Sequence, residues 1–337
     1  LCSGRAKSLD HSSHRMHSTT YVGDEEQLRS HSDASTAIAY LKERGLSGEI
    51  TAQFDLGYAP ESWDNLTSSA QDDQRRDLMI KAGLIGRSDS GRYFDWFRNR
   101  IIFPIHNNRG KVIAFGGRIL NNDDQPKYLN SRENDVFKKG SELYNLHRAK
   151  SAIVQQEISV VVEGYMDAIA AHQAGFKNVV AQMGTALTEF QVDEIRRLTG
   201  KMTMALDQDA AGQNATLRSL DVVLDNFRTK IVSNQGSSST AEADPRIIVM
   251  PPGQDPDEVI HRSPSDWTKL VESAIPAVTF RINAITSQGD TASPEGKAKC
   301  VAEAAPFIHL LGSGIQQANA IELLANNLNV PIDTVKA

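Results

Sequence analysis

The sequence has little cysteine and no long apolar run. Its two cysteines, Cys2 and Cys300, are too few for a disulfide framework or a zinc ribbon. No apolar stretch approaches the ~18 residues of a membrane-spanning helix, and the first residues lack the apolar core of a signal peptide. The rest of the composition, 40% hydrophobic and 23% charged, is that of an ordinary globular protein. These features predict a cytoplasmic protein with no membrane partner.

Negative charge slightly exceeds positive charge in the chain as a whole, but positive charge is concentrated in one segment. The net charge of −6 argues against a uniformly basic surface. Between Gly91 and Lys150, however, twelve Lys or Arg stand against six Asp or Glu, a local charge of +6 that leaves −12 on the remainder. This asymmetry predicts a local site for phosphate groups, and chance variation over sixty residues is the alternative.

The first part of the chain divides into a leader and a mixed segment. Residues 1–32 are rich in Ser and His without an apolar period, and we expect them to be disordered. Residues 33–150 contain helical patterns from Asp33, from Ser47 and over Gln74–Ala82. Over 99–119, two apolar runs joined by Asn-Asn-Arg-Gly predict a β-hairpin. Gly116-Gly117 is expected to break or bulge the second strand.

The second part alternates between strand and helix patterns. Residues 151–267 contain apolar runs such as "ISVVVEG" and "KMTMALD", separated by segments of helical period. This alternation predicts a parallel α/β sheet with right-handed crossovers. Residues 268–337 show helical patterns alone.

Acidic residues follow three of the predicted parallel strands. The carboxyl ends of parallel strands meet at one edge of a sheet, where ligands bind. Two carboxylates ~4 Å apart repel by about 4 kcal/mol at an effective dielectric of ~20, so a cation is expected among them. Oxygen ligands without His or Cys favour Mg²⁺ or Mn²⁺ over zinc. The acids that follow these strands are Glu163, Asp167, Asp207, Asp209, Asp255 and Asp257. For any one of them alone, a solvated or capping role is the alternative.

The basic segment offers donors for a triphosphate or a nucleic-acid backbone. Aromatic residues among these donors either stack on bases or belong to the core. The candidate donors are Arg98, Arg100, Arg118, Lys127, Asn130, Lys138 and Lys139, and the interleaved aromatics are Trp96, Phe97 and Tyr128.

Several long motifs carry a family resemblance. "VVEGYMD", "MGTALT", "ALDQDAAG" and "PPGQDPDEV" resemble the TOPRIM core of bacterial DnaG-type DNA primases. "FRNRIIFPIHNNRGKVIAFGGRIL" and "PKYLNSRENDVFKKGSELYNL" are similar to the basic subdomain that precedes this core, and the second block separates primases from other TOPRIM proteins. The resemblance implies an α/β fold: a TOPRIM-type parallel sheet core (151–267), a preceding mixed α+β basic subdomain (33–150) and a C-terminal helical subdomain (268–337).

The resemblance also implies an activity, which is synthesis of short RNA primers on single-stranded DNA from ribonucleoside triphosphates, by two-metal-ion nucleotidyl transfer with Mg²⁺ or Mn²⁺. Carried over by motif, the catalytic metal ligands are Glu163, Asp207 and Asp209, and the supporting acids are Asp167, Asp255 and Asp257. The implied nucleotide-binding residues are Arg118, Lys127, Tyr128 and Lys139. Those implied to contact template or primer strand are Arg98, Asn99, Arg100 and Asn130.

Three departures from the family pattern qualify these expectations. Gln208 stands where the family has glycine between two aspartates, which would weaken the site if that glycine needs a positive φ. The zinc ribbon is expected to be absent, so we expect no zinc in this chain. The domain that binds the replicative helicase is also expected to be missing, and the chain is expected to act as a monomer.

Two rival functions remain. One is a TOPRIM nuclease or topoisomerase-like enzyme. Nucleases of the overcoming-lysogenization type carry an ATPase P-loop, and this sequence has no Gly-Lys followed by Ser or Thr. The other is a catalytically weakened primase fragment that only binds single-stranded DNA. DNA degradation without ribonucleotides would favour the first, and strand binding without synthesis would favour the second.

Overall fold

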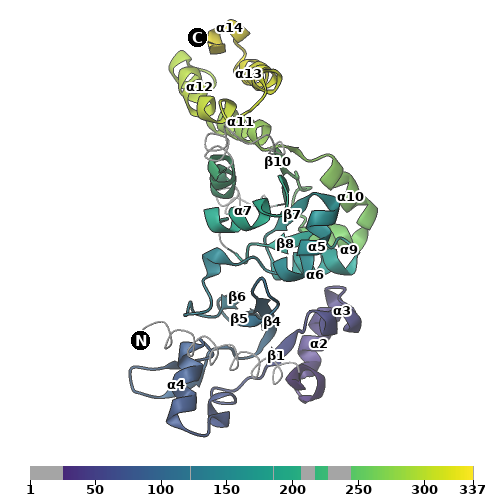
Figure 1. Ribbon diagram of the computed structural model, residues 1–337, viewed down its shortest axis with the longest axis vertical. Helices are drawn as coiled ribbons and strands as arrows, with labels where there is room; N and C mark the ends of the chain where they lie inside the picture. The colour runs from purple at the N-terminus through teal and green to yellow at the C-terminus, as the bar shows by residue number, and fades with distance from the viewer. Residues whose placement is uncertain (1–25, 122, 185, 206–216, 227–243, 337) are drawn as a thin grey trace. The chain divides into compact units, whose positions relative to one another are not determined.

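The computed structural model describes residues 26–121, 123–184, 186–205, 217–226 and 244–336 (Figure 1). Contacts between Cα atoms group the chain into two compact units. Unit 1 contains residues 1–149 with 168–176, and unit 2 contains residues 150–167 with 177–337. Within the described ranges, no helix is both long and apolar enough to cross a membrane.

Unit 1 is built on a four-stranded antiparallel sheet with the strand order β1-β4-β5-β6. Its strands are β1 (Gly57–Ala59), β4 (Arg100–His106), β5 (Val112–Ile119) and β6 (Tyr128–Asn130). A separate two-stranded sheet pairs β2 (Ile85–Arg87) with β3 (Tyr93–Asp95). The helices are α2 (Ala34–Glu43), α3 (Gly48–Gln53) and α4 (Asp73–Lys81), with 3₁₀ turns η1 (Thr67–Ser69) and η2 (Lys139–Ser141).

The predicted hairpin at 99–119 is confirmed as β4 and β5. Gly110 adopts φ +74° in the connecting turn, a conformation that glycine reaches without steric cost. The prediction that Gly116 and Gly117 interrupt the second strand was wrong. Both pair in regular register, opposite Phe103 and Ile102, and the irregularity lies at the Ile105/His106 step instead. Glycine is needed at 117 for side-chain space, because a Cβ there would lie 2.7 Å from Phe97 Cδ1.

Gly117→Ala is therefore expected to destabilise unit 1 by about 1–3 kcal/mol, the usual cost of overpacking a filled site. Besides Phe97, the added Cβ would meet Arg100 Cδ at 3.0 Å, so two neighbours must move. The matched control is Gly48→Ala, where a Cβ would have no heavy atom within 4 Å. Denaturant midpoints measured by fluorescence give the test. Equal midpoints for both variants and the wild type would contradict the packing argument.

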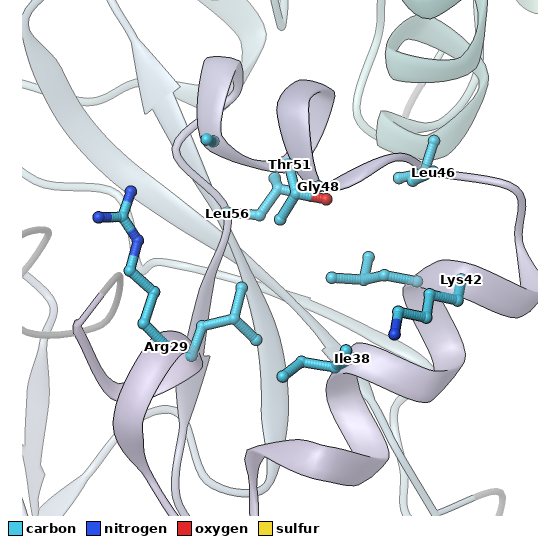
Figure 2. A pocket seen from close by; sticks show the side chains of 10 residues that line it. Arg29, Ile38, Lys42, Leu46, Gly48, Thr51 and Leu56 are labelled. Carbon is cyan, nitrogen blue, oxygen red and sulfur yellow. The ribbon is translucent and has the colours of Figure 1, made fainter.

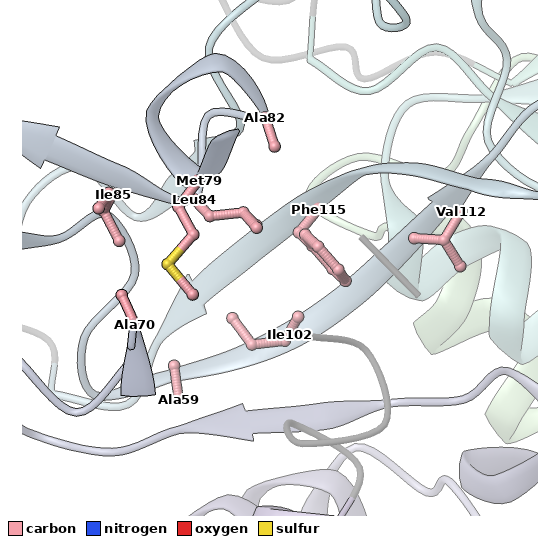
Figure 3. Packing of buried hydrophobic residues seen from close by; sticks show 9 residues of the cluster. All are labelled: Ala59, Ala70, Met79, Ala82, Leu84, Ile85, Ile102, Val112 and Phe115. Atoms are coloured by element: carbon pink, nitrogen blue, oxygen red, sulfur yellow. The ribbon is translucent and has the colours of Figure 1, made fainter. Parts of the chain in front are cut away.

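A compact apolar cluster joins the sheet of unit 1 to α4 and β2 (Figure 3). Phe115 and Ile102 project from β5 and β4, and Met79 and Leu84 come from α4 and the segment after it. Phe97 packs against this cluster with its ring centroid 6.4 Å from that of Phe115. The cluster therefore fixes Phe97, which directly precedes the predicted strand-binding residues Arg98, Asn99 and Arg100.

Residues 26–30 are helical and Leu28 is buried, so this part of the expected disordered leader is ordered. The prediction of disorder rested on the Ser- and His-rich composition of the whole segment, which gave no sign that Leu28 would be buried. Leu28 joins α2 and α3 around a pocket of about 240 Å³, whose apolar lining includes Ile38 and Leu56 and is flanked by Arg29 and Lys42 (Figure 2). The rest of the predicted leader, residues 1–25, lies outside the described residues.

Unit 2 contains the predicted parallel sheet, with the strand order β11-β10-β9-β7-β8. The four parallel strands are β7 (Ser159–Val162), β8 (Val179–Ala181), β9 (Lys201–Ala205) and β10 (Asp244–Ile247). The short β11 (Ile275–Pro276) adds an antiparallel edge that the sequence did not predict. All four residues of β7 are buried, as expected for a strand covered on both faces.

Helices alternate with these strands in the predicted order. They are α5 (Leu146–Gln156), α6 (Tyr165–Gln173), α7 (Glu189–Arg196), a helix at 217–226, α9 (Pro256–Arg262) and α10 (Pro264–Glu272). Both α5 and α6 have residues in each unit. Thr188 is the N-cap of α7, and its side chain accepts a hydrogen bond from the Gln191 N–H in a capping box.

The C-terminal part of unit 2 is helical, as predicted. It consists of α11 (Ala277–Gln288), α12 (Pro294–Ile308), α13 (Gly314–Leu328) and α14 (Ile332–Lys336). Arg281 on α11 forms ion pairs both with α12 and with the helix at 217–226. Its guanidinium lies 3.0 Å from Asp221 and 3.5 Å from Glu303, and it covers the ring of Phe307.

Candidate functional site: an acidic sheet edge and a basic aromatic surface

The carboxyl ends of β7, β9 and β10 lie at one edge of the sheet, because these strands are parallel and adjacent. The sequence predicted this common edge for the strands that its acids follow. Glu163 follows β7 directly and is half-buried, and Asp257 lies in the first turn of α9, beyond β10. Asp167 lies in the first turn of α6, one turn after Glu163.

Asp167 and Asp257 are brought together by a hydrogen bond. The backbone N–H of Asp257 donates to Asp167 Oδ1 at 3.3 Å, and the Gly164 N–H donates to Asp167 Oδ2 at 3.0 Å. Both aspartates are buried. The Asp167 carboxylate therefore joins the end of β7 to the beginning of α9, and it has a structural role whatever it binds. Gly164 has to be small, since a Cβ there would lie 2.9 Å from Asp167 Oδ2.

The other predicted acids differ in position. Asp255 is exposed as the N-cap of α9, and its N–H donates to Glu258 Oε2 at 3.4 Å, which is typical of a capping residue. Asp207 and Asp209 lie outside the described residues, as does Gln208. In the part of the chain that the structure describes, no three His, Cys, Asp or Glu side chains gather as a group able to hold a metal ion.

Unit 1 carries the basic residues. Arg100 begins β4 and is buried. Its Nη1 donates to the carbonyls of Gly117 at 3.2 Å and Pro126 at 2.9 Å. Burial lowers the pKa of this guanidinium, an effect opposed by the nearby Asp124 carboxylate. Arg100 therefore holds the β5–β6 connection in place, a role that the sequence did not predict.

Arg118 on β5 lies under two tyrosines. Its guanidinium carbon is 4.0 Å from the ring centroid of Tyr40 and 5.9 Å from that of Tyr128. Nη1 donates to the Ile119 carbonyl at 2.8 Å, whereas the buried Nε has no hydrogen-bond partner among the described residues. The cation–π contacts hold the guanidinium plane in a fixed orientation, as recognition of an anion requires.

Arg98 and Trp63 form an exposed stack that sequence reasoning missed. The Arg98 guanidinium lies 3.8 Å from the centroid of the Trp63 ring, which is 66% exposed, and Phe94 contacts the same indole edge-on at 6.3 Å. Burial lowers the pKa of Arg98, and the Asp95 carboxylate opposes that shift. Trp63 lies within "APESWDNL", thirty-five residues before Arg98, so nothing in the local pattern linked them.

A second arginine–tryptophan pair lies next to β6. Arg132 covers the face of Trp96 with its guanidinium carbon 4.0 Å from the ring centroid. The Trp96 indole N–H donates to the Asn130 carbonyl at 3.1 Å, which fixes the ring against β6. Tyr128 on the same strand is exposed. Of the three interleaved aromatics, Phe97 thus packs with the core, Trp96 is half-buried, and Tyr128 is the most accessible.

The remaining predicted residues of unit 1 are placed as follows. Lys127 is exposed just before β6. Asn99 has a left-handed backbone (φ +49°) and lines a polar pocket of about 210 Å³ with Tyr58 and Glu61. Lys138 is exposed, and its Nζ lies 4.0 Å from Glu133 Oε2.

Lys139 differs from its neighbour Lys138 because it is half-buried at the start of η2. Burial lowers the pKa of the Lys139 ammonium, an effect that the Glu133 carboxylate opposes. The two lysines are therefore not equivalent in the structure. The choice of Lys139 over Lys138 as a nucleotide-binding residue stays a prediction.

Comparison with known protein families matches three models to successive segments. Residues 24–150 match the DNA primase catalytic core, N-terminal domain. Residues 160–260 match a Toprim-like model, a family that uses divalent metal ions in general. Residues 278–333 match the DnaB-helicase binding domain of primase.

The last of these matches corrects the expectation that the helicase-binding segment is missing. The sequence analysis assigned residues 268–337 only as helical, because amphipathic periodicity reports burial and carries no information about a partner. The match covers most of α11, all of α12 and α13, and the start of α14.

Similar proteins agree with these segments. The DNA primase of Pseudomonas putida is 39% identical over 307 residues, which cover 90% of this chain and 44% of that protein. The chain thus spans about half the length of such relatives. The crystal structure of a DNA primase domain from Pseudomonas aeruginosa superposes with a TM-score of 0.82 at 35% identity, covering 96% of this chain and 98% of that one. The structure of the DnaG primase catalytic domain bound to ssDNA gives 0.83 at 31% identity, covering 97% and 99%. The chain therefore belongs to the DnaG-type DNA primase family and has the fold of its catalytic core.

Proposed function

We propose that this chain synthesises short RNA primers on a single-stranded DNA template from ribonucleoside triphosphates. The observation that carries the proposal is the acidic sheet edge, where Asp167 links the end of β7 to Asp257 at the start of α9. Nucleotidyl transfer needs no protein nucleophile, because positioning and charge stabilisation supply most of the rate. An edge of fixed carboxylates next to parallel strand ends suits that task.

The residues proposed to hold two divalent ions are Glu163, Asp207 and Asp209, with Asp167, Asp255 and Asp257 in support. The donor set fits such ions, since every proposed ligand is a carboxylate oxygen. When bound, the ions would lower the pKa of the attacking 3′-hydroxyl and offset charge on the leaving pyrophosphate. Within the protein, the N–H donors of Gly164 and Asp257 keep the Asp167 carboxylate oriented. Mg²⁺ or Mn²⁺ as the ion, and the absence of zinc, remain predictions.

The residues of unit 1 divide into two proposed groups. Arg118, Lys127, Tyr128 and Lys139 would bind the triphosphate, with the Arg118 guanidinium oriented by its tyrosine contacts. Arg98, Asn99, Arg100 and Asn130 would contact template or primer, with Arg100 acting partly by fixing the β5–β6 connection. Trp63 joins the second group, because an exposed indole with a cation on one face offers its other face to a base.

The assay for this proposal mixes the chain with single-stranded DNA, four ribonucleotides and Mn²⁺. The expected product is short RNA that resists DNase and requires all three additions. Shortening of the DNA without ribonucleotides would identify a nuclease instead. Binding of the strand without any synthesis would identify the weakened binding module.

Trp63→Ala is expected to weaken binding of single-stranded DNA by roughly 5- to 150-fold, since one stacked base contributes about 1–3 kcal/mol. The control is Phe190→Ala on α7, an equally exposed aromatic at 72% exposure that is not among the proposed contacts. Fluorescence anisotropy of a labelled oligonucleotide measures both. An unchanged affinity in the Trp63 variant would remove Trp63 from the binding surface.

Two wider expectations belong to the same proposal. The family match at residues 278–333 supports contact with a DnaB-type helicase through the C-terminal helices. The monomeric state and the cytoplasmic location stay predictions from the sequence.

A further inference from the structure

One buried polar group at the acidic edge has no role in the function proposed above. Gln182 follows β8 directly and is 2% exposed, and its Oε1 is buried without a hydrogen-bond partner among the described residues. The large majority of buried side-chain polar atoms in proteins are hydrogen-bonded. Leaving one unmatched costs about 1–3 kcal/mol, so this position needs an explanation.

The strand register places Gln182 beside Glu163. Val162 pairs with Ala181 in the parallel ladder, and the Gln182 N–H still donates to the Val162 carbonyl at 3.1 Å. Gln182 and Glu163 are therefore the next pair, one residue beyond the last ladder position on each strand. Neighbours in a parallel ladder lie on the same face about 5 Å apart. The chain turns away immediately afterwards, at Met183 with φ +62°.

The residues at the acidic sheet edge indicate what kind of group could be the hydrogen-bond partner of Gln182 Oε1. The acids described at this edge, Glu163, Asp167 and Asp257, are carboxylates, which accept but do not donate hydrogen bonds when ionised. The amide oxygen of Gln182 is a further acceptor, and the described side chains at this edge offer it no donor, whereas a bound ligand could. Divalent ions such as Mg²⁺ keep several waters when bound by carboxylates, and these waters are donors.

We propose that Gln182 is a positioning residue of the metal site, with Oε1 accepting a hydrogen bond from a water of the bound ion. The inference rests on the proposed function, because it requires an ion held by Glu163. A hydrogen bond from the outer shell orients the water and the ligands around it, and loss of such a group typically costs 10- to 100-fold in metal affinity. The unmatched acceptor would then be satisfied only in the metal-bound protein.

The test separates stability from metal affinity with Gln182→Leu. Leucine removes the unmatched acceptor at similar volume, so the melting temperature in EDTA should stay equal or rise. Affinity for Mn²⁺, measured from the free-ion signal in electron paramagnetic resonance, should fall about 10-fold or more. Gln182→Glu keeps an acceptor and adds a charge, so it should melt lower in EDTA and bind Mn²⁺ at least as tightly as the wild type.

Ser159→Ala is the matched control. Ser159 begins β7, at the opposite end of that strand from Glu163, and its buried Oγ also lacks a partner in the described chain. This variant should keep the Mn²⁺ affinity of the wild type. Equal Mn²⁺ affinity of the wild type and Gln182→Leu would overturn the role of Gln182 and leave the proposed metal site intact. Failure of the wild type to bind Mn²⁺ would overturn both.

Discussion

Glu163→Gln is expected to reduce primer synthesis by on the order of 10³-fold, because a metal-bound carboxylate supplies several kcal/mol of charge stabilisation and each 1.36 kcal/mol is about a factor of ten. The amide has the size of the carboxylate but carries no charge. Glu163 directly follows the buried strand β7, whose residues the change leaves untouched. Binding of single-stranded DNA should change little, since the proposed strand contacts lie in unit 1.

Two measurements make this result specific. Primer yield is compared with oligonucleotide affinity in the same preparation, so a misfolded variant would be recognised by loss of both. Glu189→Gln at the exposed first turn of α7 is the matched control and should keep full activity. Wild-type rates of synthesis by Glu163→Gln would show that this carboxylate is not a ligand, and the assignment of the acidic edge would have to be abandoned.

The sheet of unit 2 was predictable because its signals are local. Runs such as "SVVV" and "KMTMA" are short, apolar and rich in β-branched residues or methionine, and each is followed by a helical pattern with its own start signal. Thr188 with Gln191 is one such signal, and the structure contains the capping box that it implies. Parallel pairing then follows from the alternation, and it brings the strand ends to a common edge.

Features that depend on distant residues were not predictable in this way. Gly117 is locally typical of a strand interruption, yet it pairs in regular register. The reason for a glycine at this position is Phe97, twenty residues earlier, which fills the space that a side chain would need. The Trp63–Arg98 stack and the link between Asp167 and the Asp257 N–H also join positions far apart in sequence. Motif resemblance proposed the acids as candidates, but only the fold shows that Asp257 is buried whereas Asp255 is an exposed N-cap.

The second large expected effect concerns the free energy of unfolding at low pH, and it comes from a buried polar cluster around His106 in unit 1. His106 at the end of β4 is 7% exposed, and its ring lies 4.4 Å from that of His147. Its Nε2 is 4.0 Å from Asp55 Oδ2, which also receives the Arg148 guanidinium at 2.8 Å. Burial first and Arg148 second lower the pKa of His106 to about 4, against the opposing pull of Asp55.

The sign of the pH effect follows from this shift. The unfolded chain takes up a proton at His106 near pH 6.5, whereas the folded chain resists until about pH 4. Between these values the unfolded state binds more protons, so stability falls as the pH is lowered through this window. A shift of roughly 2.5 pH units corresponds to about 3 kcal/mol, fully present above pH 6.5 and lost near pH 4.

His106→Gln should therefore flatten the pH dependence of unfolding between pH 6.5 and 4, because glutamine does not titrate. Urea denaturation at several pH values measures the free energy of unfolding for the wild type and the variant, and their difference should change by about 3 kcal/mol across the window. His309→Gln, at an exposed position after α12, should keep the wild-type slope. If His106→Gln also keeps that slope, the acid sensitivity originates in the carboxylates, and the cluster around Asp55 and Arg148 does not hold a neutral histidine.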